Sequence, residues 1–224
     1  LLLCKSSHVT GNKFLHGHSK QVYTVDHLAG EVADPEDPPA PTFRDDVEGL
    51  RVALETALVA SVATTFDCSQ KNSVGISVLP SVDGLTVVVS AKKSRLTAFW
   101  AGRWLATFSV KNIAPGSADI SGRVDVVTHY YESGNVQLRS DKSWELVGVT
   151  GGGDAGLAAA LVSQIEQWSA EYQAALDTMI ASMGGSLKSL RRALPLTGSK
   201  MSWNLAQHAN VGMLKGVASA AAGK

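Results

Sequence analysis

Residues 120–149 read ISGRVDVVTHYYESGNVQLRSDKSWELVGV, and this stretch points to the fold class. It contains two runs, Ile120–Glu132 and Val136–Val149, that are rich in β-branched and aromatic residues. Such side chains favour β-strands, whereas the Ser133-Gly134-Asn135 sequence between the runs is typical of a turn. The stretch therefore predicts two consecutive strands joined by a short turn.

Three more runs of the same kind precede these two strands. They are Val74–Leu79, Leu85–Ser90 and Phe99–Val110, and turn signals separate them at 81–84 and 114–116. Because no helical pattern interrupts the five runs, they predict a five-stranded antiparallel meander over residues 74–150. One face of such a sheet has to be covered by another element.

A long helix over residues 151–183 is predicted to cover that face. Its apolar residues recur every three or four positions and form one continuous stripe: Leu157, Leu161, Ile165, Trp168, Tyr172, Leu176 and Ile180. The glycines at 151–153 are not followed by Lys and Ser or Thr, so they predict a turn rather than a phosphate-binding loop. We expect Asp154 to be the N-cap of the helix and Gly184-Gly185 to end it.

Residues 184–224 are predicted to form a basic C-terminal region. A short helix over Leu187–Leu194 is expected to stop at Pro195. The tail after Ser199 has a weak amphipathic pattern with two interior glycines, which predicts a mobile tail or one that lies on another surface. The fold class is thus α+β, with a sheet, a covering helix, a short helix and a mobile tail.

The part before the sheet divides into two segments. Residues 1–42 form a polar region with short β-like runs, such as Gln21–Val25, and a proline-rich acidic connector at Asp34–Pro41. Residues 43–73 hold a helix, Phe43–Phe66, and a linker. Apolar residues at helical spacing predict this helix: Val47, Leu50, Leu54, Leu58 and Val62.

Charge is balanced in number but not in position. The 224 residues contain 20 Lys and Arg and 20 Asp and Glu, so a globally basic nucleic-acid binder is not expected. Nine acids gather between Asp26 and Glu55, whereas residues 178–224 hold six basic residues and no acid. Such a local positive field steers an acidic partner, and the alternative is a solvated basic tail without a partner.

The sequence contains no recognisable catalytic or metal-binding constellation. Cys4, His8, His16 and His18 are metal-ligand types, but their spacing matches no closed zinc site. His129 has no nucleophile motif beside it, so we interpret it as a strand histidine. We therefore expect no enzyme, no cofactor and no bound metal. Two cysteines cannot make a disulfide framework, which favours a reducing, intracellular compartment. No apolar run approaches the ~18–20 residues that span a bilayer, so a membrane-spanning protein is not expected.

Two segments carry a family resemblance. Residues 128–138, THYYESGNVQL, and residues 187–197, LKSLRRALPLT, resemble two motifs of the α subunit of the heterodimeric F-actin capping protein. Other segments resemble the family more weakly, and they occur in the same order as in the family over most of the chain. Three residues depart from the motifs: Ser133 replaces Asp, Leu187 replaces Phe, and Gly198 replaces a basic Arg. The family's N-terminal helical stalk has no counterpart here, so we expect an incomplete chain or a shortened stalk.

The resemblance implies a protein of the cytoplasmic actin cytoskeleton that is not an enzyme. It implies that the sheet joins that of a β subunit in an obligate heterodimer, with the long helices packed across one larger sheet. The heterodimer would bind the barbed end of an actin filament without calcium and block subunit exchange. The resemblance would also allow binding to the actin-related filament of dynactin.

The resemblance further assigns an actin-binding site to the C-terminal region. The charged side chains of this site are expected to make the first contact with actin, guided by electrostatic attraction, and the apolar side chains to bind afterwards. The site consists of Lys188, Arg191, Arg192, Lys200, Trp203 and Leu214. Two other hypotheses stay open. One is a degenerate α-type subunit that dimerises but caps weakly, and the other is a binder of nucleic acid or anionic membranes that uses the basic tail.

Overall fold

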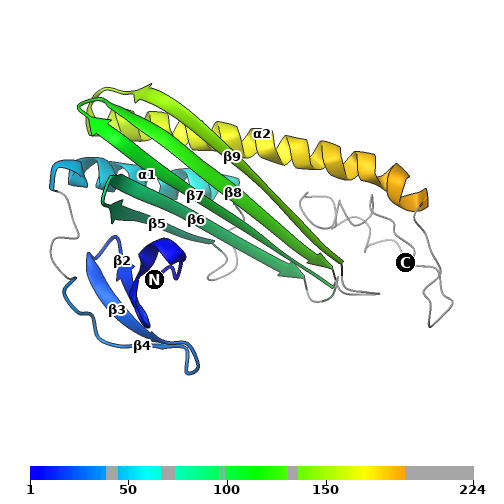
Figure 1. Ribbon diagram of the computed structural model, residues 1–224, viewed down its shortest axis with the longest axis horizontal. Helices are drawn as coiled ribbons and strands as arrows, with labels where there is room; N and C mark the ends of the chain where they lie inside the picture. Colours follow the sequence, from blue (N-terminus) through cyan, green and yellow to red (C-terminus); the bar gives the residue numbers. More distant parts are fainter. Residues whose placement is uncertain (39–44, 67–73, 96, 98, 131–135, 190–224) are drawn as a thin grey trace. The chain divides into compact units, whose positions relative to one another are not determined.

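The computed structural model is an α+β structure, as the sequence predicts (Figure 1). It describes residues 1–38, 45–66, 74–95, 97, 99–130 and 136–189. A five-stranded antiparallel sheet and a long helix follow a smaller, four-stranded sheet in the chain. The expected sheet and covering helix are confirmed, whereas the expected tail lies outside the described residues.

The large sheet has the strand order β5-β6-β7-β8-β9, so each strand lies beside its neighbour in sequence. The strands are β5 Val74–Ser81, β6 Gly84–Arg95, β7 Trp100–Ala114, β8 Ser117–Tyr130 and β9 Val136–Thr150. Several extend beyond the apolar runs that predicted them, because cross-strand pairing holds polar residues in the strand conformation as well.

A two-residue turn at Val82-Asp83 joins β5 to β6, with Ser81 opposite Gly84. Gly84 has a φ of +150°, and a Cβ at this position would overlap the carbonyl oxygen of Val110 on β7. Glycine is therefore required here, because any side chain would collide with the backbone of β7.

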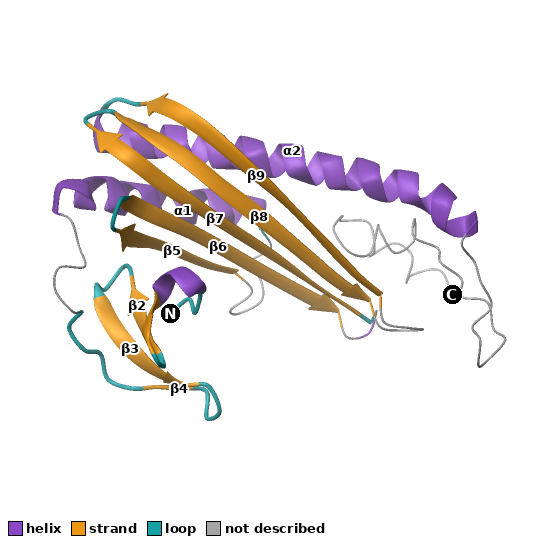
Figure 2. Cartoon of the chain, viewed as in Figure 1, coloured by secondary structure: helices purple, strands orange, loops and turns teal. Residues whose placement is uncertain are grey.

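Two helices, α1 (Glu48–Thr65) and α2 (Gly153–Ser189), lie on one face of the large sheet (Figure 2). α1 follows a 3₁₀ turn at Asp45–Val47 and buries the apolar stripe expected from its sequence. A hydrogen bond from Ser61 Oγ to Glu166 Oε1 links α1 to the first half of α2. Side chains that are fully buried in this core include Leu54, Leu58, Phe108, Val124 and Leu161.

α2 differs from the sequence-based expectation at both ends. It begins at Gly153, so Asp154 is not the N-cap but lies in the first turn, where the helix dipole favours a carboxylate. It does not end at Gly184-Gly185 but continues to Ser189. A glycine inside a helix costs only ~1 kcal/mol relative to alanine, so two of them do not have to end a long helix. The first part of the expected short helix, up to Ser189, therefore belongs to α2.

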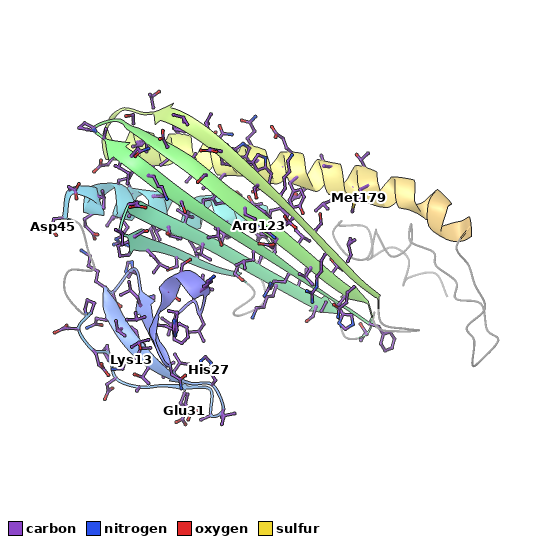
Figure 3. All side chains as sticks on the ribbon, viewed as in Figure 1. Lys13, His27, Glu31, Asp45, Arg123 and Met179 are labelled. Carbon is purple, nitrogen blue, oxygen red and sulfur yellow. The ribbon has the colours of Figure 1, made fainter. Side chains whose placement is uncertain are left out.

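The N-terminal sheet is a feature that the sequence indicated only as short β-like runs. Its strand order is β1-β2-β3-β4, with β1 His8–Thr10, β2 Lys13–His16, β3 Gln21–Asp26 and β4 Glu31–Val32. Figure 3 labels Lys13 on β2, Glu31 on β4 and His27 in the turn between β3 and β4. Part of the expected connector is attached to it, because Glu36 forms a β-bridge with Val22 and an ion pair with Lys13.

Apolar contacts join the N-terminal sheet to the large sheet. Leu15 of β2, Val22 of β3 and Leu79 of β5 form a buried cluster, with Cys4 packed against it. Val78 and Leu79 point to opposite faces of β5, and both are fully buried. The strand is therefore covered on both sides, by the helices on one face and by the N-terminal sheet on the other. We name this second face, turned away from the helices, the outer face.

Candidate functional site

The residues predicted to bind actin lie at and beyond the end of α2. Lys188 is in the last turn of α2. Arg191, Arg192, Lys200, Trp203 and Leu214 lie outside the described residues, so the actin-binding role of all six stays a prediction. The described part of the chain offers two further features that bear on function: an edge of the large sheet and a charged cluster on α1.

The edge is formed by β9, the last strand of the large sheet. Among the described residues, β8 is the only strand that pairs with it. β9 is 15 residues long, and Leu146 and Val147 near its end are 38 % and 71 % exposed. A long edge strand with exposed apolar side chains is a template for pairing with another chain.

Hydrogen bonds show which way the side chains of β9 point. Ser140 faces α2, because its Oγ accepts a hydrogen bond from the hydroxyl of Tyr172 (2.8 Å). Side chains alternate along a strand, so Arg139 and Asp141 lie on the outer face. The contact of Asp141 with Arg123 Nη2 (3.3 Å), from the outer face of β8, agrees with this assignment. Arg123 is labelled in Figure 3.

The backbone of β9 departs from the extended conformation near its end. Gly148 has a φ of +73°, and its N–H donates to Oδ1 of Asp119 on β8 (2.8 Å). Asn112 Nδ2 on β7 donates to the other oxygen of the same carboxylate (2.7 Å). The Asn112 amide and then the Gly148 N–H lower the pKa of Asp119, because both bonds favour its charged form. The positive φ of Gly148 interrupts the regular extended backbone of β9 at this residue.

The chain divides into two compact units of opposite charge. The first comprises residues 1–91, 104–125 and 141–166, and the second comprises residues 92–103, 126–140 and 167–224. The first unit holds 9 basic and 17 acidic residues, and the second holds 11 basic and 3 acidic residues. Their net charges are thus −8 and +8, and the predicted actin-binding residues belong to the positive unit.

Strands of the large sheet contribute to the positive unit. Lys92 on β6, Arg103 on β7 and Arg139 on β9 are exposed, and strand alternation places all three on the outer face. Arg123, in the other unit, is neutralised by two carboxylates. Within the described ranges, Lys92, Arg103 and Arg139 have no such carboxylate partner. Their charge is therefore available to an acidic surface.

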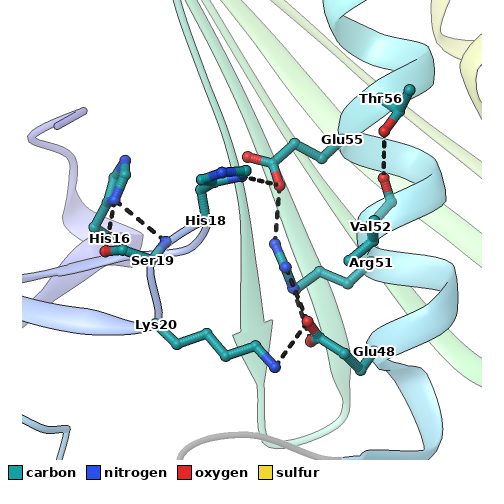
Figure 4. A network of polar contacts seen from close by, with 9 residues as sticks. All are labelled: His16, His18, Ser19, Lys20, Glu48, Arg51, Val52, Glu55 and Thr56. Atoms are coloured by element: carbon teal, nitrogen blue, oxygen red, sulfur yellow. Dashed lines mark hydrogen bonds and ion pairs between the residues drawn. The ribbon is translucent and has the colours of Figure 1, made fainter.

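A charged cluster attaches the N-terminal sheet to α1. It consists of Glu48, Arg51 and Glu55 on α1 with His18 and Lys20 from the β2–β3 turn, and we name it the α1 clasp (Figure 4). Arg51 is only 3 % exposed and donates two hydrogen bonds to Glu48 (2.9 and 3.0 Å) and one to Glu55 (3.1 Å). Lys20 Nζ lies 2.8 Å from Glu48 Oε1, and His18 Nδ1 lies 3.3 Å from Glu55 Oε2.

The α1 clasp shifts the protonation of its members. Hydrogen bonds from Arg51, with a smaller contribution from Lys20, lower the pKa of the Glu48 carboxyl from its usual 4.5 to about 2. The Glu48 carboxylate in turn raises the pKa of Arg51, so this largely buried guanidinium stays charged.

We expect this shift to make the protein acid-labile. A carboxyl whose pKa is lowered by folding stabilises the protein above its unfolded pKa and loses that contribution as the pH falls toward its folded pKa. For Glu48 this window runs from 4.5 down to about 2, and the shift corresponds to at most about 3 kcal/mol. Urea unfolding between pH 7 and pH 3 should show a shallower loss of stability for Glu48→Gln than for wild type. Glu31→Gln, at an exposed carboxylate of β4, should keep the wild-type slope.

The predicted meander already places its last strand, β9, at an edge of the sheet, but the α1 clasp was not predicted from the sequence. The spacing of Glu48, Arg51 and Glu55, three and four positions apart on a helix, is a signal that could have indicated the helical half of the α1 clasp. No comparable signal exists for His18 and Lys20, because they meet α1 only through the tertiary fold.

The possible metal ligands are not gathered into one site. Within the described residues, no three His, Cys, Asp or Glu side chains could hold a metal ion together. His8 Nε2 contacts the carbonyl oxygen of Gly11, and His16 Nδ1 contacts the hydroxyl of Ser19. None of the described helices combines the length and the apolar character needed to cross a membrane. What the described surface does offer is the β9 edge and the exposed basic side chains of the large sheet.

Comparison with known proteins identifies a family. The family model described as F-actin capping protein alpha subunit matches residues 1–213. F-actin-capping protein subunit alpha of Dictyostelium discoideum is 29 % identical over 210 residues, covering 90 % of this chain and 72 % of its own length. Its counterpart in Caenorhabditis elegans is 32 % identical over 205 residues, with coverage of 89 % and 70 %. The homodimeric actin capping protein alpha subunit of Plasmodium berghei, a solved structure, has a TM-score of 0.70 at 28 % identity and covers 88 % of this chain and 74 % of its own. This chain belongs to the family of F-actin capping protein alpha subunits.

Proposed function

We propose that this chain is the α subunit of a capping protein that binds the barbed end of actin filaments and blocks subunit exchange without calcium. The observation that carries the proposal is the extent of the family match, which reaches residue 213 and includes most of the acid-free segment after Asp177. The protein acts as a binding protein of the cytoplasmic actin cytoskeleton and performs no chemistry on its partner.

Binding proceeds in two steps. The field of the positive unit accelerates the encounter with an acidic filament end, and Lys188, Arg191, Arg192 and Lys200 make the first contacts. Trp203 and Leu214 then bury apolar surface, which slows dissociation. A capper held in this way covers the surface to which the next actin subunit would add.

The β9 edge joins this chain to its partner subunit. A capping protein β subunit would add its own sheet to β9 by antiparallel pairing, which satisfies the backbone groups of the edge and covers Leu146 and Val147. Because the edge strand is 15 residues long, we expect the unpartnered chain to aggregate or to pair with itself.

A second candidate assembly is a dimer of two identical chains. The observation that favours it is the alpha subunit of Plasmodium berghei, whose solved structure is homodimeric and resembles this chain with a TM-score of 0.70. In that assembly the capping unit would contain two copies of this chain and no β subunit.

A filament-growth assay tests the proposed function. Actin elongation from short seeds should be monitored with the full-length chain alone and with the chain co-expressed with a β subunit, in buffers with calcium and with a calcium chelator. Inhibition of elongation at substoichiometric ratios to actin, equal in both buffers, supports the proposal. Soluble, folded protein that leaves elongation unchanged at micromolar concentration, in both preparations, would contradict capping and favour a degenerate subunit.

The double variant Arg191→Ala with Arg192→Ala should slow association with barbed ends by roughly tenfold at low ionic strength, because it removes two charges from the steering field. The dissociation rate and the thermal stability should change little, because exposed charges contribute at most ~1 kcal/mol to folding. Single-filament microscopy at two salt concentrations measures both rates.

A matched control is Lys111→Ala, which removes an exposed lysine paired with Asp83 in the negative unit. It should leave the association rate unchanged. If both variants slow association equally, the steering contacts are not specific to the C-terminal region.

A further inference from the structure

Ser94 differs from the other serines of the described strands because it directly follows two lysines. Lys92, Lys93 and Ser94 are consecutive residues near the end of β6, and Ser94 is exposed. Protein kinases discriminate between substrates partly by the pattern of charges around the hydroxyl group that they modify. An exposed serine beside two cations therefore matches a kinase that selects basic substrates.

The strand register places Ser94 on the outer face of the large sheet. Leu79 of β5, which packs against the N-terminal sheet, lies opposite Thr86 of β6. Residues opposite each other share a face, and side chains alternate along a strand, so every second residue after Thr86 lies on the outer face. Lys92 and Ser94 are therefore neighbours on this face, roughly 7 Å apart along β6.

Arg103 of β7 brings another cation close to Ser94. It lies on the outer face, because the next residue, Trp104, is buried on the helix side, where its ring contacts Phe66 at the end of α1. β6 and β7 are neighbours in the sheet, and the end of β6 lies beside the start of β7. Lys92 is the fourth residue from the end of β6, and Arg103 is the fourth residue of β7. The two cations therefore lie at a similar level on strands that are about 5 Å apart.

The charges of Lys92 and Arg103 are not balanced locally. Neither side chain pairs with a carboxylate among the described residues, and like charges on neighbouring strands repel each other. Arg123, on the same face of β8, contacts two carboxylates at 2.9 and 3.3 Å. The outer face around Ser94 thus differs from that around Arg123, because its cations are open to an added anion.

A phosphate group on Ser94 fits this position in charge and in reach. Phosphoserine carries about −1.5 to −2 charges at pH 7 and has three strong acceptor oxygens. Lys92 is on the same strand and Arg103 on the next one, so both long side chains can reach one phosphate. Hydrogen bonds between such cations and phosphate oxygens are among the strongest in proteins. Phosphorylation would thus replace the repulsion between two cations with attraction to a shared anion.

The local backbone also suits modification by a kinase. Ser94 lies one residue before the end of β6, where the backbone is extended and a strand end opens at low cost in free energy. A kinase cleft holds its substrate as an extended chain, so the segment needs little rearrangement. Ser189 also lies beside basic residues, but it belongs to the helix α2, which would have to unwind first.

We propose that Ser94 is a phosphorylation site for a protein kinase that selects basic substrates, and that Lys92 and Arg103 bind the resulting phosphate. The kinase transfers the γ-phosphoryl group of ATP to Ser94 Oγ. An O–P bond forms at Oγ while the bond between the γ-phosphorus and the oxygen of the β-phosphate breaks, so ADP leaves. The hydroxyl proton passes to the catalytic aspartate of the kinase.

The modification would regulate the actin-binding region through charge. Ser94 belongs to the positive unit, whose net charge of +8 would fall to about +6. The phosphate should slow association with filament ends about threefold to tenfold at low ionic strength, because it weakens the steering field. The dissociation rate should change little. This consequence rests on the proposed function, whereas the modification and the phosphate contacts do not.

Mass spectrometry of the full-length chain tests the site. The folded chain should be incubated with ATP and the catalytic fragment of protein kinase C, which selects basic substrates. We expect near-complete phosphorylation of Ser94, and Lys92→Gln with Lys93→Gln should slow it by about tenfold or more. Ser81, an exposed serine at the end of β5 with Asp83 beside it, is the matched control and should stay unmodified. No phosphate at Ser94, or an equal amount at Ser81, overturns the proposal.

Phosphorus NMR of the phosphorylated chain tests the contacts of the phosphate. Cations beside a phosphate favour its dianionic form, so its second pKa should lie below the usual value of about 6. Arg103→Gln should raise this pKa toward 6. Arg123→Gln, at an arginine that already contacts two carboxylates, is the control and should leave it unchanged. A pKa that is not lowered, or equal effects of the two substitutions, overturns the binding of the phosphate by Arg103.

The proposed function and the proposed modification fail separately. A chain that caps filaments but takes up no phosphate at Ser94 overturns the modification alone. A chain that is phosphorylated at Ser94 yet does not cap, with or without a β subunit, overturns the proposed function alone. Equal association rates of the phosphorylated and unphosphorylated chains at low ionic strength would overturn the regulatory consequence.

Discussion

Replacing Arg51 with leucine is expected to lower the free energy of unfolding by about 3–5 kcal/mol, because it removes one partner from a buried charged cluster. The substitution leaves Glu48 and Glu55 close together and only 26 % and 19 % exposed. Lys20 and His18 are too few and too exposed to replace the guanidinium, which makes three hydrogen bonds to the two carboxylates. Urea unfolding at pH 7 measures the loss.

The matched control for this prediction is Arg123→Leu on β8. Arg123 also contacts two carboxylates, but its side chain is 54 % exposed, so its loss should cost less than about 1 kcal/mol. Hydrogen exchange adds a local test, because loss of the α1 clasp should increase exchange in residues 8–26 of the N-terminal sheet. Equal effects of the two substitutions on stability would show that the burial of Arg51 has no energetic consequence.

Replacing Gly122 with alanine is expected to lower the free energy of unfolding by about 2–3 kcal/mol, because it overpacks the centre of the large sheet. A Cβ on Gly122 of β8 would overlap the ring of Phe108 on β7 and lie 2.7 Å from the carbonyl oxygen of Thr107. Phe108 is 0 % exposed, so its ring has no solvent-filled space into which it could turn. Thermal and urea unfolding should both report the loss.

Gly152→Ala is the control for this second prediction. Nothing lies within 4 Å of a Cβ at Gly152, which is in the turn before α2, so the change should fall within about 0.5 kcal/mol of wild type. If Gly122→Ala were as stable as this control, the packing of β7 against β8 would have to be looser than the structure shows.

Local patterns were sufficient to predict the large sheet and the two helices α1 and α2. The β-branched runs predicted the strands β5 to β9, and the stripes of α1 and α2 identified the faces that each helix buries. The prediction was wrong at the end of α2, because Gly184 and Gly185 weaken a helix without having to end it. The N-terminal sheet was only partly foreseen, because strands as short as β1 and β4 contain too few residues for a periodic pattern.

The amino-acid sequence by itself determined the fold class and the family, because periodicity, turn residues and two long motifs are properties of neighbouring residues. It also determined that basic residues gather after Asp177. Only the tertiary structure decided that Arg51 is buried between two carboxylates and that the chain separates into units of charge −8 and +8. These properties depend on contacts between residues far apart in the chain, such as Lys20 with Glu48, and no local pattern records which distant segments will meet.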